Sequence, residues 1–98
     1  MSLQVLLRPD AEADLIEARD WYEAKQEGLG DEFLTCVEAA IARAARVPDE
    51  NPRAHGEVRR VLIRRFPYGV FYLVEGGALL VLAVAHVRRQ PGYWAGRM

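Results

Sequence analysis

The hydrophobic pattern of this chain changes period near its middle. In the first half, apolar residues recur every three or four positions, as at Phe33, Val37 and Ile41, which is typical of amphipathic helices. After Gly56 they alternate or form continuous runs, which is typical of strands. Helices grouped in one half and strands in the other predict an α+β fold of two packed layers.

The boundaries of the elements follow from prolines and glycines. We predict a strand over residues 3–8, a helix from residue 9 that the glycines at 28 and 30 end, a second helix over 31–46, a loop over 48–56, and strands over 57–65, 70–75 and 78–87. About three residues join the two helices, so they should form an antiparallel hairpin. The predicted fold is β-α-α-β-β-β, a two-helix hairpin packed on a small antiparallel sheet. The 98 residues fit one domain, residues 1–98.

The charges of the chain are divided between its halves. Residues 1–51 carry 5 basic and 12 acidic side chains, a net charge of −7, whereas residues 52–98 carry 8 basic and 2 acidic ones, a net charge of +6. The total of −1 hides this division. Such asymmetry suggests a charged partner.

Several classes of protein are disfavoured by what the sequence contains. It has one cysteine, Cys36, and two histidines, and it has no glycine-rich phosphate loop, so we expect neither a metal nor a cofactor. The longest apolar run, residues 78–85, is far shorter than the ~20 residues of a membrane helix. A free cysteine without an export signal points to the cytoplasm, with no membrane partner.

Arginines gather near the ends of the predicted strands, and they are the first candidate binding residues. Their guanidinium groups suit phosphates and carboxylates. One interpretation is a positive face for nucleic acid or an acidic peptide, and the other is solvated strand ends paired with the acidic helices. The second is favoured for any single arginine and the first for the group, because Glu57 and Glu75 are the only acids of the second half. The group comprises Arg59, Arg60, Arg64, Arg65, Arg88 and Arg89.

Aromatic residues and a histidine near the C-terminus are further candidates. Tyr93 and Trp94 could stack on bases beside the arginines, or they could close a small core. His86 could act as a general base, although a hydrogen-bonded imidazole in the interior is the commoner outcome. On the first helix, Tyr22 is expected in the core, and Glu23 on a solvated flank.

The ordered set of motifs resembles the RelE/ParE superfamily of bacterial toxins from type II toxin–antitoxin modules, on its ParE-like, plasmid-stabilisation branch. The resemblance runs from residue 3 to residue 97. It rests on Arg8-Pro9 with Ala11, Asp14, Leu15 and Ala18; Trp21-Tyr22; Gly28-Leu29-Gly30 with Phe33; Pro48 and Pro52; Arg59-Arg60-Val61-Leu62; Phe66-Pro67-Tyr68 with Phe71-Tyr72; and residues 86–91 (His-Val-Arg-Arg-Gln-Pro) with Tyr93-Trp94.

This resemblance implies the same β-α-α-β-β-β fold and a cognate antitoxin whose flexible, often acidic C-terminal segment wraps the toxin in a hetero-oligomer. It also implies a target. ParE-like members inhibit DNA gyrase without demonstrated catalytic machinery, whereas RelE-like members cut mRNA at the ribosome. The target and antitoxin surface would be formed by the strand-end arginines with Tyr93 and Trp94.

The ribonuclease alternative matches the sequence in part. Its candidate residues are Arg60, Arg65, His86, Arg88 and Tyr93. Where the RelE branch has an early cation on the middle strand, this chain has Gly69-Val70, and arginine donates a proton poorly because its pKa exceeds ~12. We therefore favour a toxin that inhibits gyrase and is not an enzyme, with the endoribonuclease and a non-toxic interaction domain as alternatives.

Overall fold

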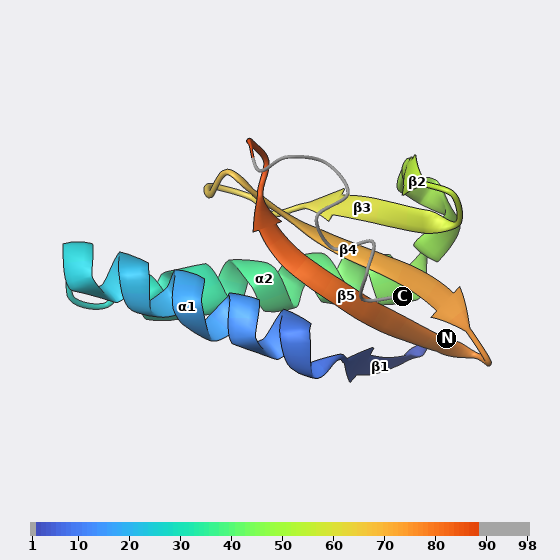
Figure 1. Cartoon of the computed structure of the whole chain (residues 1–98), viewed down its shortest axis with the longest axis horizontal. Coiled ribbons are helices and arrows are strands. Elements are labelled where there is room, and N and C mark those ends of the chain that lie inside the picture. The colour runs from blue at the N-terminus through green and yellow to red at the C-terminus, as the bar shows by residue number, and fades with distance from the viewer. Residues whose placement is uncertain (1, 89–98) are drawn as a thin grey trace.

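The computed structural model describes residues 2–88, and these residues form the predicted α+β fold of a helix pair on one sheet (Figure 1). Both helices lie on the same face of the sheet, side by side and antiparallel (Figure 1). In chain order the elements are β1 (Gln4–Leu7), α1 (Pro9–Lys25), α2 (Leu29–Arg46), the short 3-10 helix η1 (Pro48–Glu50), β2 (Arg53–His55), β3 (Val58–Leu62), β4 (Tyr68–Glu75) and β5 (Ala78–His86).

The sheet has the strand order β1-β5-β4-β3-β2, and one of its pairings differs from the prediction. The pairs from β2 to β5 are antiparallel, as predicted, but β1 runs parallel to β5. The helix hairpin carries the chain from β1 at one edge of the sheet to β2 at the other edge, and the strands from β2 to β5 return it, so β5 lies beside β1. The apolar pattern could not show this, because alternation specifies the faces of a strand and not its direction.

The predicted loop over residues 48–56 contains two short elements, so that prediction was wrong in part. Pro48 begins η1, and β2 adds three exposed residues to the edge of β3. The partner strand, rather than local preference, stabilises β2. The predicted strand over 57–65 is also shorter, since β3 ends at Leu62 and Arg65 has a φ of 74° in the turn that follows.

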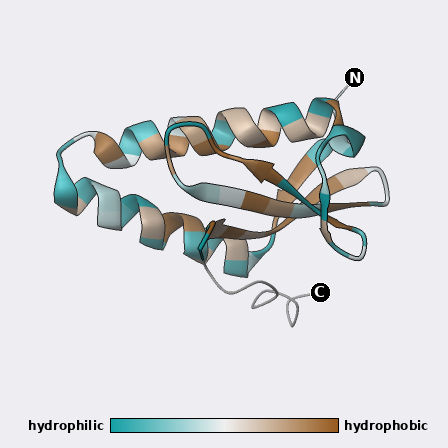
Figure 2. Cartoon of the chain, turned by 90° about the horizontal axis from the view of Figure 1, so that it is seen from above, coloured by the Kyte–Doolittle hydropathy of each residue, from teal (hydrophilic) through white to brown (hydrophobic). Residues whose placement is uncertain are grey.

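The main core lies between the helices and the sheet. Its largest fully buried side chains include Phe33 of α2, Tyr72 of β4 and Leu79 of β5. A smaller buried cluster of Val58, Leu82 and Ala83 belongs to the other face of the sheet. In Figure 2 much of the central sheet is hydrophobic, whereas both helices alternate between hydrophilic and hydrophobic residues, as two-layer packing requires.

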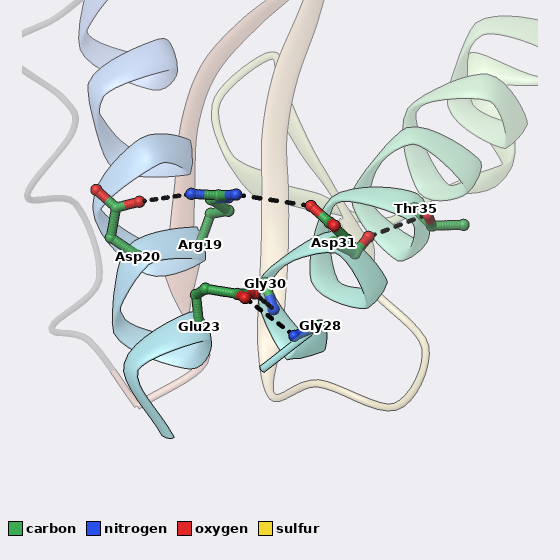
Figure 3. Close-up of polar contacts among 7 residues, drawn as sticks. All are labelled: Arg19, Asp20, Glu23, Gly28, Gly30, Asp31 and Thr35. Carbon is green, nitrogen blue, oxygen red and sulfur yellow. Dashed lines mark hydrogen bonds and ion pairs between the residues drawn. The ribbon is translucent and has the colours of Figure 1, made fainter. Parts of the chain in front are cut away.

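The helix hairpin is closed by Glu23 of α1, a half-buried residue that the sequence had placed on a solvated flank (Figure 3). Its carboxylate accepts hydrogen bonds from the backbone N–H groups of Gly28 and Gly30, each at 2.9 Å. These two bonds lower the pKa of Glu23, because they stabilise its charged form. Glu23 thus caps α2, which begins at Leu29, two residues earlier than predicted.

Gly30 allows the two helices to approach closely at this point. A Cβ atom on Gly30 would lie 2.8 Å from the carbonyl oxygen of Arg19 and 2.8 Å from Oε1 of Glu23. Gly28 has a different role, since it precedes α2 with a φ of 87°. The two glycines that we expected to end the first helix therefore shape the hairpin and the start of the second.

Candidate functional site

The predicted arginines of β3 point to opposite faces of the sheet, as neighbours on a strand must. Arg59 faces the helix layer, where its side chain is 20% exposed. Its Nη1 donates to the backbone oxygens of Asn51 at 2.6 Å and Asp49 at 3.2 Å, and its Nη2 lies 3.8 Å from Oδ1 of Asp49. Arg59 thus fastens the segment around η1 to the sheet, which is a structural role.

Tyr72 holds the same segment from the neighbouring strand. Its hydroxyl donates to the backbone oxygen of Pro48 at 2.7 Å and accepts a hydrogen bond from Nδ2 of Asn51 at 3.0 Å. Burial raises the pKa of the Tyr72 hydroxyl, so the neutral form that makes both bonds is favoured. Together Arg59 and Tyr72 fix Asn51 in place beside the edge of β3.

A groove of about 360 Å³ lies at this edge of β3, and it brings together two of the predicted arginines. Arg60 and Arg64 line it together with Arg43 of α2. Arg43 was not among the candidates, because in the sequence it stands in the last turn of a helix, where a cation is expected for helix stability alone. The groove also includes Asn51, whereas none of its lining residues is acidic.

Gly69 makes room for Arg60 on the adjacent strand. Gly69 pairs with Leu62, and a Cβ atom on it would lie 3.1 Å from Cγ of Arg60. The absence of a side chain lets the stem of Arg60 lie across β4. Gly69 stands where the ribonuclease alternative would need a cationic side chain, and here it has a packing role instead.

Arg65 is tied to the helix layer and does not line the groove. Its Nη2 lies 3.6 Å from Oε1 of Glu32 on α2, and its guanidinium carbon lies 5.9 Å from the centre of the Phe66 ring. The pairs Arg65–Glu32 and Arg59–Asp49 join the basic second half to the acidic first half. Part of the charge division therefore serves the fold.

His86 and Arg88 lie at the end of β5. His86 is half-buried, its ring contacts Tyr68 with 5.4 Å between the ring centres, and its Nδ1 accepts a hydrogen bond from the backbone N–H of Arg88 at 3.0 Å. In its neutral form the imidazole therefore carries its proton on Nε2. His86 is therefore hydrogen-bonded, but it is half-buried rather than in the interior, and its partner is only two residues away in the sequence.

Within residues 2–88, the ribonuclease candidates do not converge on one face of the sheet. Arg60 pairs with Phe71, which belongs to the face opposite the helices, whereas His86 pairs with Tyr68, which packs against the main core on the helix side. Arg65 lies in the turn after β3. The remaining predicted site residues, Arg89, Tyr93 and Trp94, lie outside the described residues.

A second groove, of about 740 Å³, lies between α1 and the end of β5, and we did not predict it. Acidic and aromatic side chains share its lining, among them Glu17, Asp20 and Trp21, which is 56% exposed. Asp14 reaches across it, since Oδ2 of Asp14 accepts a hydrogen bond from the backbone N–H of Val84 at 3.1 Å. The described surface therefore has an acidic groove on α1 and a basic one at β3.

Two further observations concern ligands and membranes. Residues 2–88 contain no group of three or more histidine, cysteine or acidic side chains placed to hold a metal ion. Neither of the two described α-helices is long and apolar enough to cross a membrane.

Comparison with known proteins identifies the family. The family described as "ParE toxin of type II toxin-antitoxin system, parDE" matches residues 5–91 of the sequence. The chain belongs to the ParE toxin family. The match includes every element of the fold except the first residue of β1, and it extends over Arg88 and Arg89.

A solved structure agrees with this ParE fold. The chain is similar to one from "Chromosomal ParDE TA system from P. aeruginosa", with a TM-score of 0.74 and 18% sequence identity over 87% of this chain and 96% of that one. No curated protein sequence matches significantly. The predicted family and fold are thus confirmed, and the ParE chain is the toxin component of a type II toxin–antitoxin system.

Proposed function

We propose that this ParE chain inhibits DNA gyrase without a catalytic step and is neutralised by a cognate antitoxin in a hetero-oligomer. The observation that carries the proposal is the family match over residues 5–91. Gyrase inhibition is the activity that the ParE-like resemblance implied. The toxin would act as a ligand of the enzyme, so its surface, rather than a reactive group, would determine the outcome.

The arrangement of charged residues supports this proposal over RNA cleavage. A ribonuclease needs a base, an acid and a cation around one phosphate. Here Arg60 and His86 belong to opposite faces of the sheet, and Gly69 stands where the cation of the middle strand would be needed. Binding, in contrast, requires no such convergence.

The antitoxin is expected on the basic side of the molecule. Arg60 and Arg64 line the groove at β3 with Arg43, and an acidic segment would complement their charges. Replacing Arg60 and Arg64 by glutamate should weaken the complex, and more so at low salt, because exposed charges are screened by salt. Arg46→Glu is a matched control, since Arg46 is exposed at the end of α2 and does not line the groove.

A supercoiling assay tests the proposed target. The purified chain is added in increasing molar ratio to DNA gyrase, relaxed plasmid and ATP, with and without the protein encoded beside it. We expect supercoiling to fall with the toxin and to recover when the neighbouring protein is added. Normal supercoiling at a large excess of folded chain would contradict gyrase inhibition.

The endoribonuclease alternative has its own signature. Primer extension on mRNA from induced cells would show new cleavage ends, and the double variant Arg88→Ala with Tyr93→Phe would lose them. We expect no new cleavage ends in the mRNA. Toxicity should not depend on catalytic chemistry at residues 88 and 93. New cleavage ends that disappear in the double variant would contradict gyrase inhibition. They would show that the target is mRNA at the ribosome.

A further inference from the structure

The outer edge of β3 is unevenly covered. β2 pairs with the beginning of this strand, where Arg53 is opposite Arg59 and His55 is opposite Val58. The N–H of Arg60 then donates to the oxygen of Pro52, the residue before β2, at 3.1 Å. Beyond Arg60, no strand of the described part of the chain continues the sheet.

The backbone beyond this point directs hydrogen-bonding groups outward. The N–H of Ile63 donates inward to the oxygen of Tyr68 at 2.9 Å, so the N–H and C=O groups of the neighbouring Leu62 face the outer edge. We infer that the same alternation, continued past the end of β3, directs the backbone groups of Arg64 outward as well. The oxygen of Leu62 confirms this direction, because it accepts a hydrogen bond from Nη2 of Arg43 at 3.0 Å. The edge thus offers the pattern of donors and acceptors that a further strand would pair with.

The side chains at this edge specify the charge of such a strand. Arg60 and Arg64 line the groove beside β3, and Arg43 reaches it from the helix layer. Leu62 lies between Arg60 and Arg64 in the sequence and is 52% exposed. A strand added here would alternate its side chains between both faces, so carboxylates could meet arginines on either face, with an apolar residue over Leu62.

We propose that an acidic peptide segment in extended conformation binds as an additional strand along residues 60–64, at the end of β3 and just beyond it. The outward backbone groups of Leu62 and Arg64 provide the pairing, and the three arginines select carboxylates. In the free chain, Arg43 occupies the oxygen of Leu62 and protects the edge. Because this hydrogen bond is exposed to solvent, little free energy is lost when Arg43 exchanges it for a contact with a carboxylate.

A peptide fits this edge better than a nucleic acid. Phosphates would use the arginines alone, whereas a peptide also satisfies the backbone groups between them. The bend at Arg65, with its φ of 74°, limits the pairing to a few residues, which suits a reversible contact. The statement that the antitoxin supplies this segment rests on the proposed function, but the binding of an acidic strand does not.

The test uses defined probes with the isotope-labelled full chain, and it measures amide exchange and chemical shifts by NMR. The probe is a blocked Glu-Glu-Val-Glu-Glu peptide. The matched controls are its Gln-Gln-Val-Gln-Gln analogue, the acidic peptide N-methylated at alternate residues, and an oligothymidylate. At a peptide concentration tenfold above Kd, exchange at Leu62 and Arg64 should slow about tenfold. The N-methylated and glutamine peptides should bind more weakly.

Two variants of Leu62 separate backbone pairing from side-chain contact. Leu62→Pro removes the outward N–H without removing an inward bond, and proline is tolerated on edge strands. Leu62→Ala keeps the N–H and loses the same side chain. We expect Leu62→Pro to abolish protection at Arg64 and Leu62→Ala to weaken binding about two- to fivefold. Should Leu62→Pro fail to fold, the N-methylated peptide makes the same comparison on the unchanged chain.

Three results would overturn the proposal: no protection of Leu62 and Arg64 by the acidic peptide, equal binding of the N-methylated peptide, or preferential binding of the oligothymidylate. None of these measurements involves gyrase or toxicity. A negative result in these measurements therefore does not contradict the proposed function. Normal supercoiling in the gyrase assay likewise does not contradict peptide binding at this edge.

Discussion

Arg43 of α2 donates a hydrogen bond to the backbone oxygen of Leu62 on β3, at 3.0 Å. This contact joins the helix layer to the uncovered part of a strand edge. It also places a cation from the acidic half of the chain beside Arg60 and Arg64. The basic groove of this ParE toxin is therefore built by both layers. Four predictions test contacts beside this groove and in the helix hairpin.

Arg59 and Arg60 are neighbours with different roles, and their alanine variants should separate them. Arg59→Ala removes the hydrogen bonds to Asn51 and Asp49 and should cost about 1–2 kcal/mol of unfolding free energy. Arg60→Ala should change stability by less than about 0.5 kcal/mol, because the half-buried Arg60 makes no side-chain hydrogen bond or ion pair with the described residues. Urea unfolding of both variants measures the difference. Equal losses would contradict the division of roles.

Gly30 is required by the close approach of the helices. Gly30→Ala would place a Cβ atom 2.8 Å from the backbone oxygen of Arg19, which cannot move without its helix. We expect a loss of about 1–3 kcal/mol in urea unfolding. Gly28→Asn is the control, since asparagine tolerates the left-handed backbone and a Cβ atom there meets open space. A stable Gly30→Ala variant would show that the helices can separate at no cost.

Glu23 should make stability depend on acid pH. Its folded pKa is lowered by the hydrogen bonds from Gly28 and Gly30, so its contribution is present above the ordinary value of 4.5 and is lost as the pH falls through the folded pKa. Glu23→Gln should lower the melting temperature at neutral pH, and the difference from the unmodified chain should shrink in acid. Thermal unfolding across this range measures both. A difference that does not vary with pH would refute the role of the charge.

Tyr72 anchors η1 through its hydroxyl group. Tyr72→Phe leaves the oxygen of Pro48 and the amide of Asn51 without this partner, which should cost about 1–2 kcal/mol in urea unfolding. Burial raises the folded pKa of Tyr72, so its contribution is complete below the ordinary value of 10.0 and is lost as the pH rises through the folded pKa. The unmodified chain should therefore lose more stability in alkali than Tyr72→Phe. The same alkaline slope in both would exclude Tyr72 as its source.

The sequence was sufficient for the family, the layers and most of the element boundaries, because these depend on local periodicity and turn residues. It was insufficient wherever pairing between distant segments decides the outcome. β1 joins β5 in parallel, and β2 forms where only a loop was predicted. Neither result is encoded in the local pattern of the strand concerned.

The candidate site shows the same limit more sharply. Six arginines were singled out by their position near strand ends, and of these the structure brings Arg60 and Arg64 together at one groove. Arg59 and Arg65 belong to the fold, and Arg43, which completes the groove, came from a helix where nothing local marked it. Glu23 was likewise read from its helical position, although its partners lie across the hairpin.

Growth after induction tests most directly whether this ParE chain acts as a toxin. The chain is expressed from a tight promoter in bacteria that lack its neighbouring gene, with a frameshifted gene as the control, and optical density and viable counts are followed. We predict that growth stops after induction and resumes when the neighbouring protein is co-expressed. Growth equal to that of the frameshift control, while the soluble chain accumulates, would contradict the account.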